Sequence, residues 1–130
     1  MSMTWHEIGL AAAQAEAPSI TLDGLVAQKL GANPRTRYSQ DFAAARSAFP
    51  EGWGFWLDCP PGGRAPYCEG IGTQRVGSTG QYEIGAMLAA ACMVQSYVEN
   101  RRQREEREIA ARRARQPQPE AKPQDEGAPA

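Results

Sequence analysis

The sequence is poor in the residues on which most catalytic and metal sites depend. It holds a single histidine, His6, and three cysteines in 130 residues. No pair of cysteines has the short spacing of a zinc site. A lone histidine without a neighbouring nucleophile is more often a surface or packing group than a catalyst. We therefore expect a protein that is not an enzyme, with no catalytic residue, no metal and no cofactor.

Other signatures of chemistry are missing too. The stretch GIGTQRVG (residues 70–77) lacks the spacing of a phosphate-binding glycine loop. Five carboxylates of the first two thirds of the chain show no paired spacing for acid–base work. They suit helix caps, turns and exposed strand positions instead: Asp41, Glu51, Asp58, Glu69 and Glu83.

The sequence also lacks any apolar run long enough to span a bilayer, and its N-terminus lacks the pattern of a signal peptide. The net charge of -1 produces no overall field that would attract nucleic acid or a membrane. We expect a cytoplasmic protein with no membrane partner. An odd number of cysteines then indicates reduced thiols. We expect Cys59 and Cys92 to be buried and Cys68 to be partly exposed.

The stretch YSQDFAAARSAFPEGWGFW (residues 38–56) predicts a short helix, a turn and an aromatic strand. Ser39 is the expected helix N-cap, with Asp41 in the first turn. Pro50 ends the helix. Residues 53–59 then alternate as a half-buried strand does. Phe55 and Leu57, with Cys59, point to one side, and Trp56 and Asp58 point to the other.

Two further strands are expected after a loop rich in proline and glycine. The first covers residues 67–72, with Tyr67, Glu69 and Ile71 on one side, and the second covers residues 73–77. Because sequential strands are usually neighbours, the three strands predict an antiparallel meander.

Helices are expected on both sides of these strands in the sequence. Residues 1–20 form an N-terminal segment in which Trp5, Ile8 and Ala12 or Ala15 have helical spacing. Thr21 is the expected N-cap of the next helix and Gly31 its C-cap. The apolar stripe of that helix is Leu22, Leu25, Val26 and Leu30.

The last helix has the clearest pattern. Ser78 and Gln81 have the spacing of a capping box. Apolar residues then recur at alternating intervals of three and four positions, at Ile84, Met87, Ala91, Val94 and Val98, and Leu88 and Cys92 widen the stripe. Residues 99–115 continue as a charged Arg/Glu helical extension with ion pairs one turn apart. Residues 116–130 are expected to be a disordered tail. Together these elements predict one small α+β domain at residues 21–98, built as two layers or as an α/β/α sandwich.

The order of these segments resembles small phage and prophage proteins with the phage ABA sandwich domain. The resemblance covers residues 22–98. It is carried by LDGLVAQKLG, YSQDFAAA, the PEGW turn and GAMLAAACMV. The glycine-rich third strand and the arginine-rich extension depart from the family pattern. The resemblance implies a phage or prophage accessory protein in a bacterial host cell, with no established reaction and no catalytic residues.

Two surfaces are candidates for binding. The first is aromatic and consists of Trp53, Trp56 and Tyr67, which could contact a host or phage protein. Because helices are available for both faces of the sheet, we expect Trp56 to be buried between the sheet and the N-terminal helices. We expect a protein-binding module, with interference with a host defence or regulatory system as one version.

The second candidate surface is basic and would contact nucleic acid phosphates. It consists of Arg101, Arg102, Arg104, Arg107, Arg112, Arg113 and Arg115. Three glutamates interrupt these arginines, so a solvated, salt-bridged helix is the competing interpretation. A homodimer through the same last helix is a further expectation.

Overall fold

The computed structural model describes residues 3–116 of the chain. The chain divides into two compact units, Met1–Glu99 and Asn100–Ala130. The elements follow the predicted α+β order: α1 (Trp5–Gln14), α2 (Ile20–Leu30), α3 (Phe42–Ser47), β1 (Gly54–Asp58), β2 (Tyr67–Ile71), β3 (Arg75–Thr79) and α4 (Glu83–Arg115). The tail predicted for residues 116–130 lies outside the described residues, apart from Gln116.

The three strands form the predicted antiparallel meander, in the order β1-β2-β3. β3 begins two residues later than expected. The backbone N–H of Gly72 donates to the carbonyl of Gln74 (3.0 Å), so residues 72–74 close a hairpin before the strand can start. β3 consequently extends to Thr79 and includes Ser78, which was expected to cap the last helix. α4 begins only at Glu83, so the predicted capping box is wrong.

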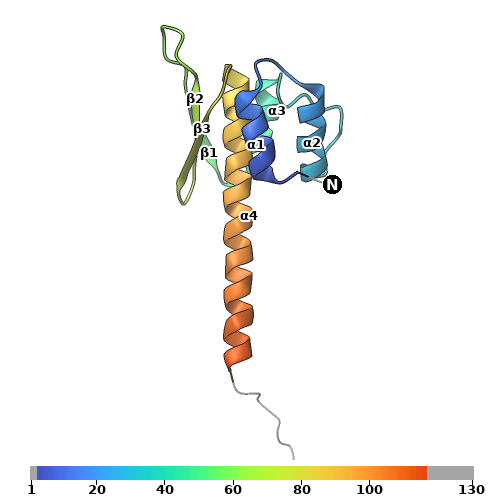
Figure 1. Ribbon diagram of the computed structural model, residues 1–130, viewed down its shortest axis with the longest axis vertical. Coiled ribbons are helices and arrows are strands. Elements are labelled where there is room, and N and C mark those ends of the chain that lie inside the picture. Colours follow the sequence, from blue (N-terminus) through green and yellow to red (C-terminus); the bar gives the residue numbers. More distant parts are fainter. Residues whose placement is uncertain (1–2, 117–130) are drawn as a thin grey trace, which may run out of the picture. The chain divides into compact units, whose positions relative to one another are not determined.

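The helices of the first unit all lie on one face of the sheet. Figure 1 shows the sheet on one side of the first part of α4, with α1 and α2 on the other side. An α/β/α sandwich therefore does not form. This part of α4 is buried all round from Gly85 to Cys92, as a helix with apolar or small residues on every side should be.

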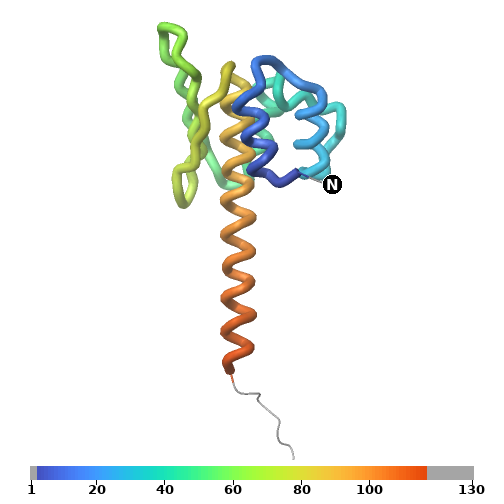
Figure 2. The backbone as a smooth tube through the Cα atoms, viewed as in Figure 1, coloured from blue at the N-terminus to red at the C-terminus, as the bar shows by residue number. Residues whose placement is uncertain are grey.

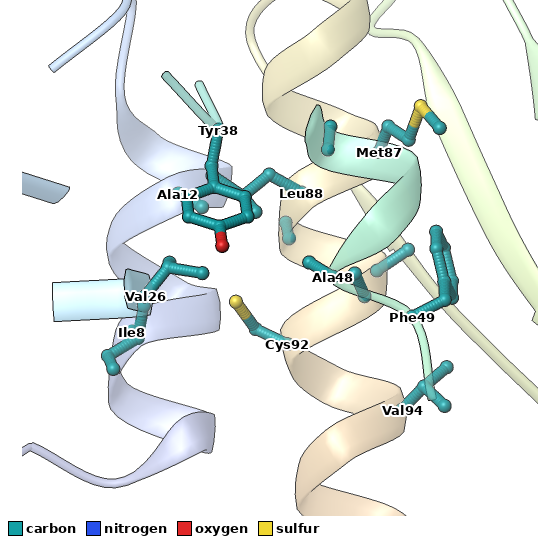
Figure 3. Close-up of a cluster of buried hydrophobic side chains, with 14 of the residues drawn as sticks. Ile8, Ala12, Val26, Tyr38, Ala48, Phe49, Met87, Leu88, Cys92 and Val94 are labelled. Atoms are coloured by element: carbon teal, nitrogen blue, oxygen red, sulfur yellow. The ribbon is translucent and has the colours of Figure 1, made fainter. Parts of the chain in front are cut away.

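Side chains from both sides of α4 build the core. In Figure 3, Leu88 and Cys92 are directed toward Val26 of α2 and Tyr38. Met87 and Val94 lie on the side of Phe49, the residue that leads from α3 toward the sheet. All of these side chains are at most 9% exposed. The predicted stripe of the last helix is confirmed at these positions.

The N-terminal helix docks as its spacing predicts. Trp5, Ile8 and Ala12 are buried. Thr4 and Glu7 form an unpredicted capping box: the Glu7 N–H donates to Thr4 Oγ1 (3.1 Å) and the Thr4 N–H donates to Glu7 Oε1 (2.8 Å). At Gly9 the helix packs closely on side chains of α4, because a Cβ there would lie 2.9 Å from Cε of Met93.

Two predicted helix caps are wrong by two residues. α2 is capped by Ser19, whose Oγ accepts from the Leu22 N–H (3.1 Å), and not by Thr21. α3 is capped by Asp41, whose carboxylate accepts from the Ala43 N–H (3.2 Å). Ser39, the expected cap, is fully buried instead.

A buried polar cluster explains the position of Ser39. Its backbone N–H donates to the carboxylate of Asp23 (2.6 Å). Its hydroxyl accepts from the Ser19 N–H (2.9 Å), and its carbonyl accepts from the Tyr82 hydroxyl (2.7 Å). Ser39 thus joins the start of α2 to the segment that precedes α4, and its hydroxyl is not available to α3.

Candidate binding surfaces

Among residues 3–116, no helix covers one of the two faces of the sheet. Figure 2 shows the backbone of the sheet beside α4, with the far side of the sheet uncovered by the rest of the first unit. Alternation along the strands places one set of side chains on that side. We call this surface the open face and define it by Trp56, Tyr67, Glu69, Ile71 and Arg75.

Trp56 is the most exposed large aromatic group of the first unit's sheet. Trp56 is 51% exposed, whereas its neighbours Phe55 and Leu57 are partly buried against the core. The prediction that Trp56 would be buried between sheet and helices is wrong. The helices occupy only the face to which Phe55 and Leu57 point, so the opposite side chain stays in contact with water.

The carboxylate of Glu69, at the centre of the open face, holds the ring of Tyr67 in place. The Tyr67 hydroxyl donates to Glu69 Oε2 (2.8 Å), and Arg75 Nη1 lies 3.4 Å from Glu69 Oε1. The ring of Trp56 packs edge-to-face on Tyr67, with centroids 6.2 Å apart. The hydrogen bond to Glu69, followed by burial, raises the pKa of Tyr67. The phenol therefore stays protonated and keeps donating.

Gly77 makes room for this arrangement. A Cβ on Gly77 would lie 2.2 Å from the Tyr67 hydroxyl oxygen, so the tyrosine ring crosses the sheet directly over this glycine. The ring would have to move if residue 77 carried a side chain. A glycine of the glycine-rich third strand is thus a feature of the open face.

Trp53 does not belong to the open face. It lies on the helix side, where its ring is close to Gly72, since a Cβ on that glycine would be 2.6 Å from the ring. Its other neighbour is Tyr97 of α4, at 6.0 Å between ring centroids. The predicted trio therefore separates into Trp56 and Tyr67 on one face and Trp53 on the other. Trp53 lines a pocket of about 360 Å³ with Arg46, Phe49 and Phe55.

The predictions for Cys59 and Cys68 are wrong, and the predicted burial of Cys92 is confirmed. Cys59 is exposed, because β1 ends at Asp58 and the loop begins there, while Cys68 and Cys92 are buried. Cys68 points from the middle strand to the helices, where the strand alternation puts it. Burial raises the pKa of both thiols to about 12. Both thiols are therefore protonated at neutral pH. Because only the thiolate is nucleophilic, they act as packing groups.

The arginine-rich surface belongs to the second unit. All of its residues from Asn100 to Gln116 are exposed, and they are helical as far as Arg115. An ion pair joins Arg101 Nε to Glu105 Oε2 (3.4 Å). The three glutamates end at Glu108. The last turns therefore carry only the arginines at 112, 113 and 115, which the helix dipole favours at a C-terminus.

Residues 3–116 contain no cluster of three or more histidine, cysteine, aspartate or glutamate side chains that could hold a metal ion. His6 is exposed on α1. Within the same residues, no helix is long and apolar enough to cross a membrane.

Comparisons with known proteins give no match: no family model, no curated protein and no solved structure is significantly similar to the chain. The resemblance to phage ABA sandwich proteins therefore stays a prediction.

Proposed function

We propose that this chain is a non-enzymatic protein-binding module whose contact surface is the open face of the sheet. The observation that carries the proposal is the exposure of Trp56 at 51%, on a sheet face that none of the described helices covers. Exposed tryptophan is among the residues most enriched in the energetic centres of protein interfaces. The protein fits a phage or prophage accessory factor that acts on a host or phage protein in the bacterial cytoplasm.

The open face also indicates the chemistry of its partner. Trp56 and Ile71 (37% exposed) offer apolar area. The side chain of Arg75 is 72% exposed, and its single long contact with Glu69 leaves guanidinium donors available. A complementary surface would pack an apolar side chain on Trp56 and bring a carboxylate to Arg75. Interference with a host defence or regulatory protein is one role that such a surface could serve.

Affinity capture with matched variants tests the proposal. Immobilised full-length chain, the Trp56→Ser variant and the Ile20→Ser variant are each mixed with bacterial lysate, with and without nuclease. Ile20 is the control because it is 75% exposed but lies on α2. We expect a protein that resists nuclease and is retained by wild type and Ile20→Ser but not by Trp56→Ser. Loss of a central tryptophan typically weakens binding by about 2 kcal/mol or more, roughly 30-fold.

Equal retention by wild type and Trp56→Ser would contradict the proposal. A second open-face variant, Arg75→Glu, reverses the charge offered to the partner at the other edge of the sheet. It should reduce capture as well.

The alternative function is nucleic-acid binding by the second unit. Seven exposed arginines against three glutamates over residues 100–116 support it. This alternative predicts binding to duplex nucleic acid that weakens steeply with salt. It also predicts loss of that binding when the seven arginines become glutamine. Unchanged binding by the glutamine variant would eliminate it.

A further inference from the structure

The outer edge of β1 is an unused site for strand pairing. β1 pairs with β2 on one side only. Within residues 3–116, no hydrogen bond connects the backbone of Gly54–Asp58 to anything on its other side. Natural sheet edges are usually protected by proline, lysine, a bulge or a covering element. The strand GFWLD has no proline or lysine, and its register with β2 runs without a bulge.

The strand is complementary to a second copy of itself. In an antiparallel pair centred on Trp56, a two-fold axis places Trp56 opposite Trp56 of the second copy. Phe55 then lies opposite Leu57, and Gly54 lies opposite Asp58. The alternation keeps Phe55 and Leu57 of both copies on the helix side. The single charge of the strand meets a glycine and not a like charge, so the register has no repulsive pair.

Apolar groups flank this edge on both faces of the sheet. Trp56 is 51% exposed on the open face. On the helix side, Phe42 is 43% exposed and packs edge-to-face on Phe55 at 5.9 Å. A strand added to β1 would cover part of the rings of Trp56 and Phe42. Exposed apolar groups beside an unpaired strand edge are typical of a site of protein–protein contact.

We propose that two copies of this chain associate through the outer edges of β1 to form a continuous antiparallel sheet of six strands. The two Trp56 side chains lie next to each other at the two-fold axis. Such an isologous contact closes on itself and generates a dimer, not a fibre. The inference goes beyond the proposed function, because it adds a contact through the backbone of the β1 edge. Trp56 is shared between the two-fold axis and the partner surface, and Tyr67, Ile71 and Arg75 stay available to a partner.

Charged substitutions of Trp56, at the proposed two-fold axis, test the dimer without any partner protein. Light scattering after size exclusion should give twice the 14.1 kDa chain mass for the full-length wild type at high concentration. Trp56→Lys and Trp56→Glu each place two like charges at the axis. Each variant should weaken the dimer by about tenfold or more. An equimolar mixture of the two should recover a dimer containing one copy of each.

The control is Ile71→Lys, which adds the same charge to the open face but on the middle strand. It should dimerise as wild type does. Far-UV circular dichroism verifies that each variant is folded. A wild type that stays monomeric, or lysine and glutamate variants that still dimerise alone, would overturn the proposal. Monomeric variants whose mixture forms no dimer would overturn the register centred on Trp56. A dimer unaffected by every change at Trp56 would point to the last helix.

The failure of this inference and that of the proposed function are distinguishable. Arg75 lies on β3, the strand farthest from the proposed axis. Arg75→Glu should therefore reduce partner capture while the dimer remains intact.

Discussion

At the residue scale, glycines mark where backbones approach each other most closely. A Cβ on Gly80 would lie 2.4 Å from the backbone nitrogen of Ala86, because the chain leaves β3 in direct contact with the first turn of α4. Gly24, in the middle of α2, has no atom within 4 Å of the same position. The two glycines therefore make a matched pair.

Gly80→Ala should destabilise the protein by about 2–3 kcal/mol, because the backbone of α4 would have to shift to admit the methyl group. Gly24→Ala should stabilise it by about 0.5–1 kcal/mol, since alanine restricts the unfolded chain and favours a helix. Urea denaturation of the two variants measures both changes. Equal free energies of unfolding for the two variants would contradict the close approach at Gly80.

The buried thiols predict a pH dependence of stability. The pKa of Cys68 and Cys92 rises from 9.0 to about 12 on folding because burial disfavours the thiolate. The unfolded chain therefore loses these protons first. The contribution of both thiols is complete below pH 9 and is lost as the pH rises toward 12. Thermal denaturation from pH 8 upward should show this loss, and Cys92→Ala should reduce its slope. A slope identical to that of wild type would contradict the burial of Cys92.

At the element scale, helices and strands were predictable, and the predicted C-cap of α2 at Gly31 is confirmed, but the N-caps of α2 and α3 and the start of α4 were not predictable. The spacing of Met87, Cys92 and Val94 predicts a helix whatever its neighbours are, because the pattern itself carries the signal. A cap depends on which of several nearby hydroxyl or carboxylate groups is free. Ser39 lies in a good local context for a cap, yet contacts 16 and 20 residues away bind it elsewhere. Local sequence contains no information about such contacts.

The Asp23–Ser39 hydrogen bond is the element-scale connection most open to test. Asp23→Ala removes the acceptor of the buried Ser39 N–H and should cost about 1–3 kcal/mol. Asp23→Asn keeps an oxygen acceptor of similar size and should cost less. Chemical denaturation of both variants against wild type measures the difference. An alanine variant as stable as wild type would show that water replaces the carboxylate there.

The open face was predictable in part at the same scale. Alternation alone puts Tyr67 and Glu69 on one side of their strand. The exposure of Trp56 was missed because the sequence contains enough helices to cover both faces. Arg75 was missed because the third strand was placed two residues early, and a slip in register changes which residues are neighbours. Trp53 was grouped with Trp56 by proximity in sequence, although odd and even positions of a strand face opposite ways.

At the scale of the whole molecule, each unit offers one exposed isoleucine on its candidate surface. Ile71 lies on the open face, and Ile109 (45% exposed) lies among the arginines of residues 100–116. Ile20, on α2, serves as a third exposed isoleucine outside both surfaces. Three residues of one type can thus report on the two proposed functions and on a neutral surface.

The most direct measurement is photo-crosslinking in bacterial cells from a benzophenone amino acid placed at position 71, 109 or 20 of the full-length chain. Binding through the open face predicts a crosslinked protein from position 71, none from position 20, and loss of the position-71 product when Arg75→Glu is added. Products that arise from position 109 alone, or equally from positions 20 and 71, would contradict it.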